Sequence, residues 1–208
     1  MIANMGTASA DIKRISDEIS RNGWARSISS FPPDLLLQLS EEARLHEVAG
    51  RLSQASTGRN GSKTLSSIRG DSTLWLDDIR CGNASKMFLQ ALDILRKDLN
   101  QSMMLGLDTV EAHFAVYPAG ASYSRHKDRF RDDDARLLSL VCYLNADWPE
   151  DAGGALRLHL HDGNKDIVPM SGTTVLFLSD EIEHEVLQAT QTRYSIAAWF
   201  RRHENPHY

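Results

Sequence analysis

Cysteine is scarce in this chain, which has 208 residues and only two cysteines, Cys81 and Cys142. Two cysteines do not suffice for the framework of several disulfide bonds that stabilises small secreted domains. One disulfide bond between them stays possible. Two reduced thiols in a cytoplasmic protein are the simpler expectation, because disulfide bonds are rare in that compartment.

Long apolar runs are also missing. No stretch approaches the about 20 apolar residues that a membrane-spanning helix needs. The first residues, MIANMGTASADIK, have no basic segment followed by an apolar one, so we expect no signal peptide. Together these absences predict a cytoplasmic protein without a membrane partner.

A run of basic residues is missing as well. The formal net charge is −5, the isoelectric point is near 5.9, and the nearest approach to a basic run is Arg201-Arg202. Proteins that bind nucleic acid usually carry a basic face, which attracts the phosphate groups. We therefore expect no nucleic-acid partner.

The composition is that of a globular protein, with 41% hydrophobic and 25% charged residues. We predict a single domain over 1–208, long enough to bury a sizeable core. Residues 1–105 are expected to be mainly helical, because their apolar residues recur at helical spacing. Helices are predicted around 12–19, from Pro33 onward with Leu36, Leu39, Ala43 and Leu45 on the apolar side, and over 84–100. The polar, Gly- and Ser-rich segment 50–64 is predicted to be a loop.

Residues 106–202 follow a different pattern, in which short β-rich runs alternate with turn signals. Many short strands at this spacing are typical of a sandwich or barrel. The two patterns together predict an α+β fold, with N-terminal helices packed on a double-stranded β-helix (jelly-roll) core. The expected strands are 111–117, 123–128, 137–144, 155–160, 173–178, 185–187 and 194–201.

His126 and Asp128 form an H-x-D pair, and His184 follows far enough downstream for several strands to intervene. Side chains at i and i+2 of a strand share a face, so His126 and Asp128 can both turn inward while Lys127 points outward. Two imidazoles and one carboxylate on one face of a metal leave the opposite positions open. This is the facial triad of non-haem Fe(II) oxygenases. Zinc takes the same ligands, so a zinc site is an alternative.

Arg193 interrupts an apolar run nine residues after His184. A buried arginine needs an anionic partner. Its planar fork suits a dicarboxylate such as 2-oxoglutarate, and a structural salt bridge is the alternative. A rival histidine pair, His159 and His161, has no third ligand downstream, so we do not expect it to bind metal. The other histidines are expected at the surface or beside the metal site: His46, His113, His203 and His207.

The chain from Ala112 to Arg202 resembles the 2-oxoglutarate- and Fe(II)-dependent prolyl hydroxylases. It is most similar to the animal hypoxia-sensing enzymes and to the bacterial enzymes that modify elongation factor Tu. The blocks that carry the resemblance are VYP (116–118), YSRHKD (123–128), YLNxxW (143–148), GGxLR (153–157), HEV (184–186) and RYxIxxW (193–199), with IRGD (68–71) and Trp75 upstream. The run FRDDD (130–134) resembles the bacterial branch in particular.

The resemblance implies a role for each matching residue. His126, Asp128 and His184 would bind Fe(II), and Arg193 would bind the distal carboxylate of 2-oxoglutarate. Tyr117 and Tyr143 stand where the family hydrogen-bonds this cosubstrate, with a purely structural role in the core as the alternative for Tyr117. Collagen-type enzymes usually carry lysine where Arg193 stands, so the collagen branch fits less well. The residues implied in substrate binding are Arg69, Asp71, Tyr123, Arg136 and Trp199.

The resemblance also implies the reaction and its partners. The expected activity is 4-hydroxylation of a peptidyl proline, with 2-oxoglutarate and O2 as cosubstrates and ascorbate as a supporting reductant. The expected partner is a loop of elongation factor Tu, and a monomer is expected. One alternative is a 2-oxoglutarate oxygenase acting on a small molecule or another protein, and a second is a jelly-roll binding module without catalysis. A zinc hydrolase would need a general base beside the metal-bound water, and no residue is an evident candidate.

Overall fold

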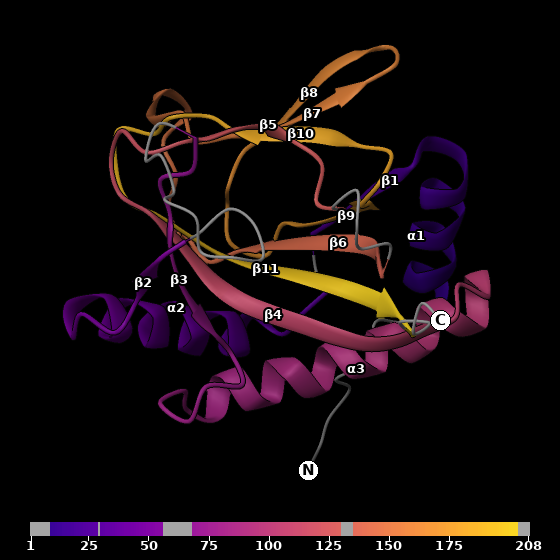
Figure 1. Ribbon diagram of the computed structural model, residues 1–208, viewed down its shortest axis with the longest axis horizontal. Helices are drawn as coiled ribbons and strands as arrows, with labels where there is room; N and C mark the ends of the chain where they lie inside the picture. Colours follow the sequence, from indigo (N-terminus) through magenta and orange to yellow (C-terminus); the bar gives the residue numbers. More distant parts are fainter. Residues whose placement is uncertain (1–8, 29, 56–67, 130–134, 204–208) are drawn as a thin grey trace, which may run out of the picture.

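The computed structural model of the chain describes residues 9–28, 30–55, 68–129 and 135–203. Its helices are α1 (Ser9–Asn22), α2 (Pro33–Val48), α3 (Asn83–Met103) and the short 3-10 helix η1 (Glu150–Ala152). None of the helices in these residues is long and apolar enough to cross a membrane. α2 and α3 lie along one face of a large sheet, and α1 packs at the end of that sheet where β1 runs (Figure 1).

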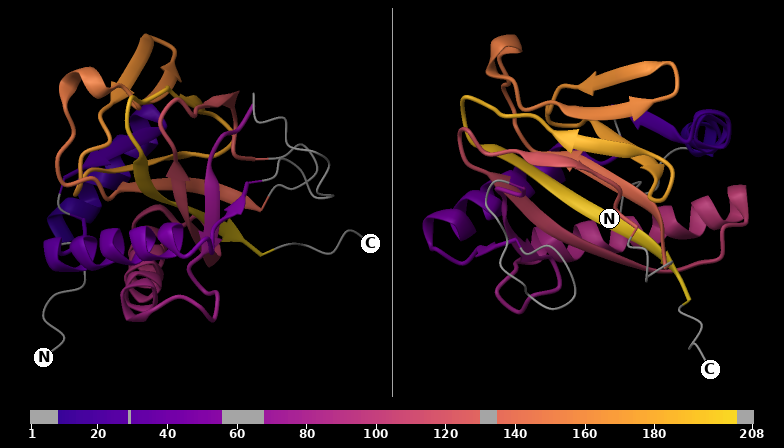
Figure 2. Two further views of the ribbon diagram at one scale, coloured as in Figure 1. Left: turned by 90° about the vertical axis from the view of Figure 1, so that its left-hand side faces the viewer. Right: turned by 45° about the horizontal axis from the view of Figure 1, so that its top comes forward.

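The strands form two antiparallel sheets that face each other (Figure 2). The seven-stranded sheet, called the major sheet below, has the order β1-β9-β6-β11-β4-β3-β2. Its strands are β1 (Trp24–Ser27), β2 (Ser53–Gln54), β3 (Ser72–Trp75), β4 (Leu107–Tyr117), β6 (Arg136–Tyr143), β9 (Thr174–Leu178) and β11 (Arg193–Arg202). The four-stranded minor sheet has the order β5-β10-β7-β8, with β5 (Tyr123–His126), β7 (Leu156–Leu160), β8 (Gly163–Ile167) and β10 (Glu183–Val186).

The helices form where apolar residues recur on one face. Ile12, Ile15 and Ile19 of α1 are all buried, and Gly23, whose φ is +76°, ends that helix in a conformation that glycine adopts without strain. α2 starts at Pro33, where the missing N–H costs nothing. The isoleucines of α1 and the apolar stripe of α3 cover the outer face of the major sheet. The residues of the α3 stripe are Phe88, Leu92, Leu95 and Leu99.

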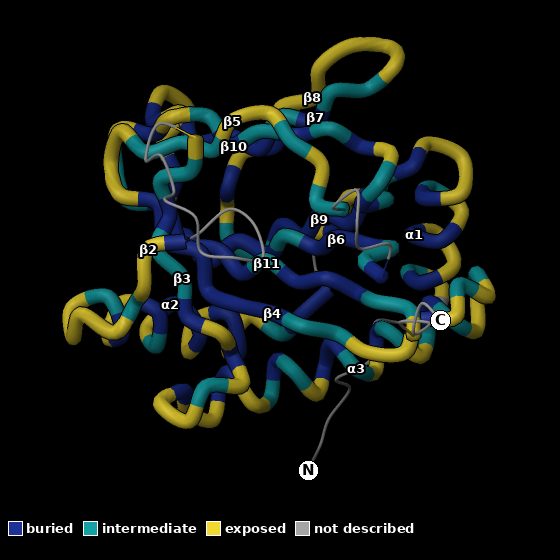
Figure 3. The backbone as a smooth tube through the Cα atoms, in the orientation of Figure 1, coloured by how far each residue is buried: buried dark blue, intermediate teal, exposed yellow. Residues whose placement is uncertain are grey.

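Strand alternation decides which side chains of β11 face the site. Tyr194, Ile196 and Phe200 join the core beneath the helices. Arg193 and the other odd-numbered residues Ser195, Ala197 and Trp199 line a pocket between the two sheets. Because successive side chains point to opposite faces, one strand supplies both the core and the site. Figure 3 shows the buried central strands β4, β6 and β11 and the exposed tip of the β7–β8 hairpin.

The predicted α+β jelly-roll fold is confirmed, and so are the three helices. Several details were wrong. β1, β2 and β3 were not predicted, because short strands in a mainly helical region carry too little periodicity. β8 was not predicted either, and Leu45, predicted on the apolar face of α2, is exposed. The predicted loop 50–64 contains β2, and from residue 56 onward it lies outside the described residues. The single-domain organisation stays a prediction.

Candidate active site

The minor sheet brings His126 and His184 face to face. His126 is the last residue of β5 and pairs in register with His184 of β10, while Asp128 follows just after β5 ends. The Nε2 atom of His126 lies 3.5 Å from Oδ1 of Asp128, and the Nε2 atom of His184 lies 3.7 Å from Oδ2. One ligand atom of each residue lies within 4.8 Å of the other two. The three residues predicted as metal ligands therefore converge on one point.

Backbone carbonyl groups orient both imidazole rings. Nδ1 of His126 lies 2.7 Å from the carbonyl oxygen of Ser124, and Nδ1 of His184 lies 3.3 Å from that of Ile182. A carbonyl oxygen only accepts hydrogen bonds, so Nδ1 carries the proton in both rings. The Nε2 lone pairs are then free and directed toward Asp128, as metal ligation requires.

The protonation states of the triad also suit a cation. Burial favours the neutral form of Asp128, but His184, His126 and the hydroxyl of Ser139 outweigh burial and hold the pKa of Asp128 well below its usual range. Burial lowers the pKa of His184. One carboxylate and two imidazoles whose Nε2 atoms face it are the donor set that ferrous iron takes in a facial triad, so these residues fit that metal.

Asp128 is held in place from the major sheet. The Oγ atom of Ser139 in β6 donates a hydrogen bond of 2.6 Å to Oδ2 of Asp128 and lies 2.9 Å from Oγ of Ser179. Both serines are buried. Ser139 was not predicted as a site residue, although its position two and four residues before Val141 and Tyr143 puts it on the inward face of the predicted strand.

Arg193 lies at the other end of the site and is only 2% exposed. Its guanidinium donates to Oγ of Ser195 at 3.0 Å, and its carbon Cζ lies 5.1 Å and 5.0 Å from the ring centres of Tyr117 and Tyr143. Among the described residues, its Nε atom and the Tyr143 hydroxyl have no hydrogen-bond partner. Burial raises the pKa of Tyr143, so its hydroxyl keeps its proton and can donate.

No carboxylate among the described residues pairs with Arg193. The alternative of a structural salt bridge therefore finds no support in the described part of the chain. A buried guanidinium beside an unpartnered phenol hydroxyl is arranged for a missing anion, because an unpaired buried charge is costly. The two groups fit the distal carboxylate of 2-oxoglutarate.

The predicted substrate residues form two charged pairs at the rim. Asp71, fully buried, accepts two hydrogen bonds from Arg69, of 2.6 Å and 2.9 Å. Arg69 also lies over the ring of Tyr123, 4.9 Å from its centre, and that ring stacks on His126 with 3.6 Å between ring centres. A change in the position of Arg69 would therefore reach His126, a predicted metal ligand, through the ring of Tyr123.

On the other side of the rim, Arg136 hydrogen-bonds Glu111 at 2.7 Å and lies 3.9 Å from the ring centre of Trp199. Trp199 also contacts His113, which in turn lies edge-on to Trp75. His113 lies beside the site, as one of the two predicted positions had it, but it is buried and not at the surface. Burial lowers the pKa of His113 to about 4.

The structure thus brings nearly all of the predicted residues into one pocket. Tyr143 does not line it directly and reaches it through its contact with Arg193. The rival pair does not form a metal cluster within the described residues, and His159 instead lies 3.1 Å from Glu185. The run FRDDD (130–134) lies outside the described residues. The lining residues that were predicted are Arg69, Asp71, Tyr117, Tyr123, His126, Asp128, Arg136, His184, Arg193 and Trp199.

A model of the 2OG-Fe(II) oxygenase superfamily matches residues 112–201, the segment that contains the triad and Arg193. The human protein Egl nine homolog 1 is 28% identical over 173 residues, which cover 78% of this chain and 40% of that protein. The rat protein of the same name is also 28% identical, and 50% of it is covered. The chain therefore spans half or less of the length of these curated relatives.

Two solved structures are similar over nearly the whole chain. A prolyl-4-hydroxylase from Pseudomonas putida is 42% identical with a TM-score of 0.84, covering 93% of this chain and 100% of that one. A prolyl hydroxylase from Trichoplax adhaerens, solved with a peptide of the hypoxia inducible factor oxygen degradation domain, is 25% identical with a TM-score of 0.85. The second match covers 93% of this chain and 90% of that one.

Proposed function

The chain belongs to the 2-oxoglutarate- and Fe(II)-dependent oxygenases, in their prolyl hydroxylase branch, and we propose that it 4-hydroxylates a proline in a loop of a protein substrate. One observation carries the proposal. The triad of His126, Asp128 and His184 lies in one pocket between the two sheets together with Arg193, which pairs with no carboxylate among the described residues. A metal-binding module without catalysis has no need of a second, buried cationic anchor.

Each end of the pocket has a separate task. His126, Asp128 and His184 would hold the metal, while Arg193 and Tyr143 would bind the distal carboxylate of 2-oxoglutarate. Tyr117, whose ring lies 5.1 Å from the guanidinium carbon of Arg193, would close the pocket against the cosubstrate. Two fixed attachment points restrict the cosubstrate to one orientation, and restricted orientation lowers the barrier to reaction.

Ferrous iron with 2-oxoglutarate supplies, when bound, an O2-dependent oxidation that places one oxygen atom in a C–H bond and the other in succinate, with release of CO2. The protein's residues supply position and exclusion of water. Trp199, Tyr123 and Val186 line the space where a prolyl ring would lie. An apolar wall there excludes water, which protects the bound reactants from side reactions.

The rim residues support a peptide as substrate. Arg69, Asp71 and Arg136 are charged or hydrogen-bonding groups beside the opening, and backbone amides of a peptide offer matching donors and acceptors. We propose elongation factor Tu as the substrate, on the basis of the resemblance of this sequence to the bacterial enzymes that modify it. Monomeric state, cytoplasmic location and stimulation by ascorbate stay predictions.

The test is succinate release from 2-oxoglutarate with Fe(II), ascorbate and purified elongation factor Tu. Factor-dependent turnover that is lost in Arg193→Ala, together with a gain in mass of one oxygen atom on a proline of the factor, is the expected result. Slow turnover that the factor does not stimulate would keep the oxygenase but contradict this substrate. No turnover with iron verified as bound would favour the binding module instead.

A further inference from the structure

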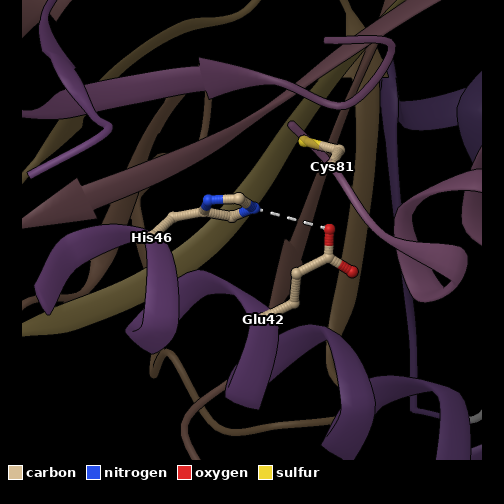
Figure 4. Close-up of side chains that lie close together, drawn as sticks. All are labelled: Glu42, His46 and Cys81. Carbon is tan, nitrogen blue, oxygen red and sulfur yellow. Dashed lines mark ion pairs between the residues drawn. The ribbon is translucent and has the colours of Figure 1, made fainter. Parts of the chain in front are cut away.

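A second cluster of metal-ligand side chains lies outside the active-site pocket, between α2 and the segment that precedes α3. Glu42 and His46 are four residues apart on α2 and so share one face of the helix. Cys81 comes just before α3 starts at Asn83. One ligand atom of each residue lies within 4.8 Å of the other two (Figure 4).

His46 is the unexplained member of this cluster. It is only 3% exposed, although the sequence placed it at the surface or beside the active site. Among the described residues neither nitrogen of its ring makes a hydrogen bond: Nδ1 has no partner, and Nε2 lies 3.6 Å from Oε1 of Glu42. Buried imidazole nitrogens are normally hydrogen-bonded, so a ring directed at a carboxylate beyond hydrogen-bond distance indicates a missing ligand.

The other two side chains are already fixed in place. Glu42 accepts hydrogen bonds from the backbone N–H of Gly82 at 2.6 Å, from that of Ser85 at 3.2 Å and from the Ser85 hydroxyl at 2.7 Å. The Cys81 thiol donates to the carbonyl oxygen of Trp75 at 3.3 Å. A cation would therefore meet donors that need little reordering.

We propose that Glu42, His46 and Cys81 bind a divalent cation of the zinc type, with the fourth position open to water. Sulfur, imidazole nitrogen and carboxylate oxygen are the donors that zinc takes, whereas magnesium and calcium take oxygen alone. The active-site triad contains no sulfur, so sulfur distinguishes the two sites. A cation would give Nε2 of His46 a ligand bond in place of its 3.6 Å ion-pair contact with Glu42 (Figure 4), and would tie α2 to the start of α3.

Two features of the site limit its affinity. The three hydrogen bonds to Glu42 already draw on its negative charge, so binding is expected to be weaker than at a site of unencumbered ligands. Burial raises the pKa of Cys81 to about 11, with Glu42 and Asp78 adding to the effect and Ser85 and Arg80 opposing it. A cation must displace the thiol proton, so affinity should rise by about tenfold per pH unit while that is the only proton released.

Titration of the intact protein with Co(II) tests the site, because a cobalt–thiolate bond gives a charge-transfer band in the near ultraviolet. The Cys142→Ser variant is the matched control, since Cys142 is the other cysteine of the sequence, is also buried and is not a member of the cluster. Asp128→Ala removes a ligand of the active-site triad and leaves the cluster intact. The band is expected in the native protein and in both of these variants, and it should vanish in Cys81→Ser.

A His46→Gln variant keeps a polar side chain of similar length and should raise the Co(II) concentration at half saturation by at least about tenfold. A native protein without the band, or a band that survives in Cys81→Ser, would overturn the proposal. Neither result depends on turnover, so the proposed hydroxylase and the proposed cation site are tested separately.

Discussion

The major and minor sheets differ in how firmly the rest of the chain holds them. β4 and β11 of the major sheet have 11 and 10 residues, pair along nearly their whole length and are covered by the helices. The strands of the minor sheet have four or five residues, and all of β8 except Ile167 is exposed. A long, covered sheet opens only with global unfolding, whereas short, exposed strands open at a lower free-energy cost.

The residues of the candidate site are divided between the two sheets. Arg193 and Tyr143 belong to the major sheet, while His126 and His184 belong to the minor sheet. The proposed cosubstrate anchor is therefore part of the well-covered sheet, and two of the three proposed metal ligands, His126 and His184, lie on the sheet that can adjust. This division predicts that changes on the minor sheet act on the metal and that changes on the major sheet act on the cosubstrate.

The largest effect is expected for Asp128→Ala. Loss of a charged ligand should weaken Fe(II) binding by more than about 100-fold, since even residues behind the ligands contribute 10- to 100-fold. The Fe(II) affinity measured by titration and the rate of succinate release should fall together. His159→Ala is the matched control, because His159 lies on the minor sheet outside the pocket. Equal losses in both variants would mean that the minor sheet had unfolded and that the ligand role was not tested by this change.

Arg193→Gln should raise the KM for 2-oxoglutarate by about 100-fold, the loss of one or two hydrogen bonds to a charged group. Fe(II) affinity should stay within about twofold of native. Arg193→Lys should recover only part of the loss, because an ammonium group lacks the planar fork. Arg157→Gln, at an exposed ion pair of the minor sheet, is the control and should change neither constant. A KM that is unchanged in Arg193→Gln would contradict the anchor.

A third effect concerns stability and comes from His113 on β4. Burial lowers the folded-state pKa of His113 from 6.5 to about 4, and the positive charges of Arg69 and Arg136 lower it further. Asp71 and the hydrogen bond between His113 and the carbonyl of Phe114 oppose this shift. Between pH 6.5 and about 4, the unfolded state therefore binds a proton at His113, whereas the folded state does not. The stabilising contribution is complete above pH 6.5 and is lost as the pH falls toward 4, for a total of about 3 kcal/mol.

Urea unfolding at a series of pH values measures this effect. Between pH 7 and 4 the free energy of unfolding of His113→Gln should fall by about 3 kcal/mol less than that of the native protein. Carboxylates titrate in both proteins, so the difference isolates the histidine. Parallel curves for the two proteins would show that His113 has the same pKa in the folded and unfolded states, and would contradict the depressed folded-state pKa.

The sequence predicted the residues of the site better than their supports. An H-x-D pair is common by itself, but its combination with a distant histidine and an arginine beside an apolar run stands out, and the fold brings the four residues together. Ser139 was missed, and the sequence could not decide between two positions for His113. The role of each residue depends on which strand lies opposite, which strand pairing decides and local spacing does not. The Glu42–His46–Cys81 cluster depends on how α2 packs against α3, so its members gave no signal in the sequence.

The smallest of the expected effects is the most informative about the comparison, because Ser139 lies on the major sheet but contacts a metal ligand. Its hydroxyl holds Oδ2 of Asp128 at 2.6 Å. Ser139→Ala should weaken Fe(II) binding by about tenfold and leave the affinity for 2-oxoglutarate unchanged. The visible band of the anaerobic Fe(II)–2-oxoglutarate complex should shift, since the carboxylate ligand turns.

Ser179→Ala is the matched control, because Ser179 contacts the Ser139 hydroxyl and not Asp128 in the described hydrogen bonds. Its effect on Fe(II) binding should be smaller than that of Ser139→Ala and in the same direction. If Ser139→Ala left the metal affinity and the band as they are, the minor sheet alone would orient Asp128. If Ser139→Ala changed the affinity for 2-oxoglutarate and not that for Fe(II), the major sheet would act on the site only through the proposed cosubstrate anchor, Arg193. The expected tenfold loss would identify Ser139 as the point where the major sheet fixes Asp128, the proposed metal ligand that follows β5 of the minor sheet.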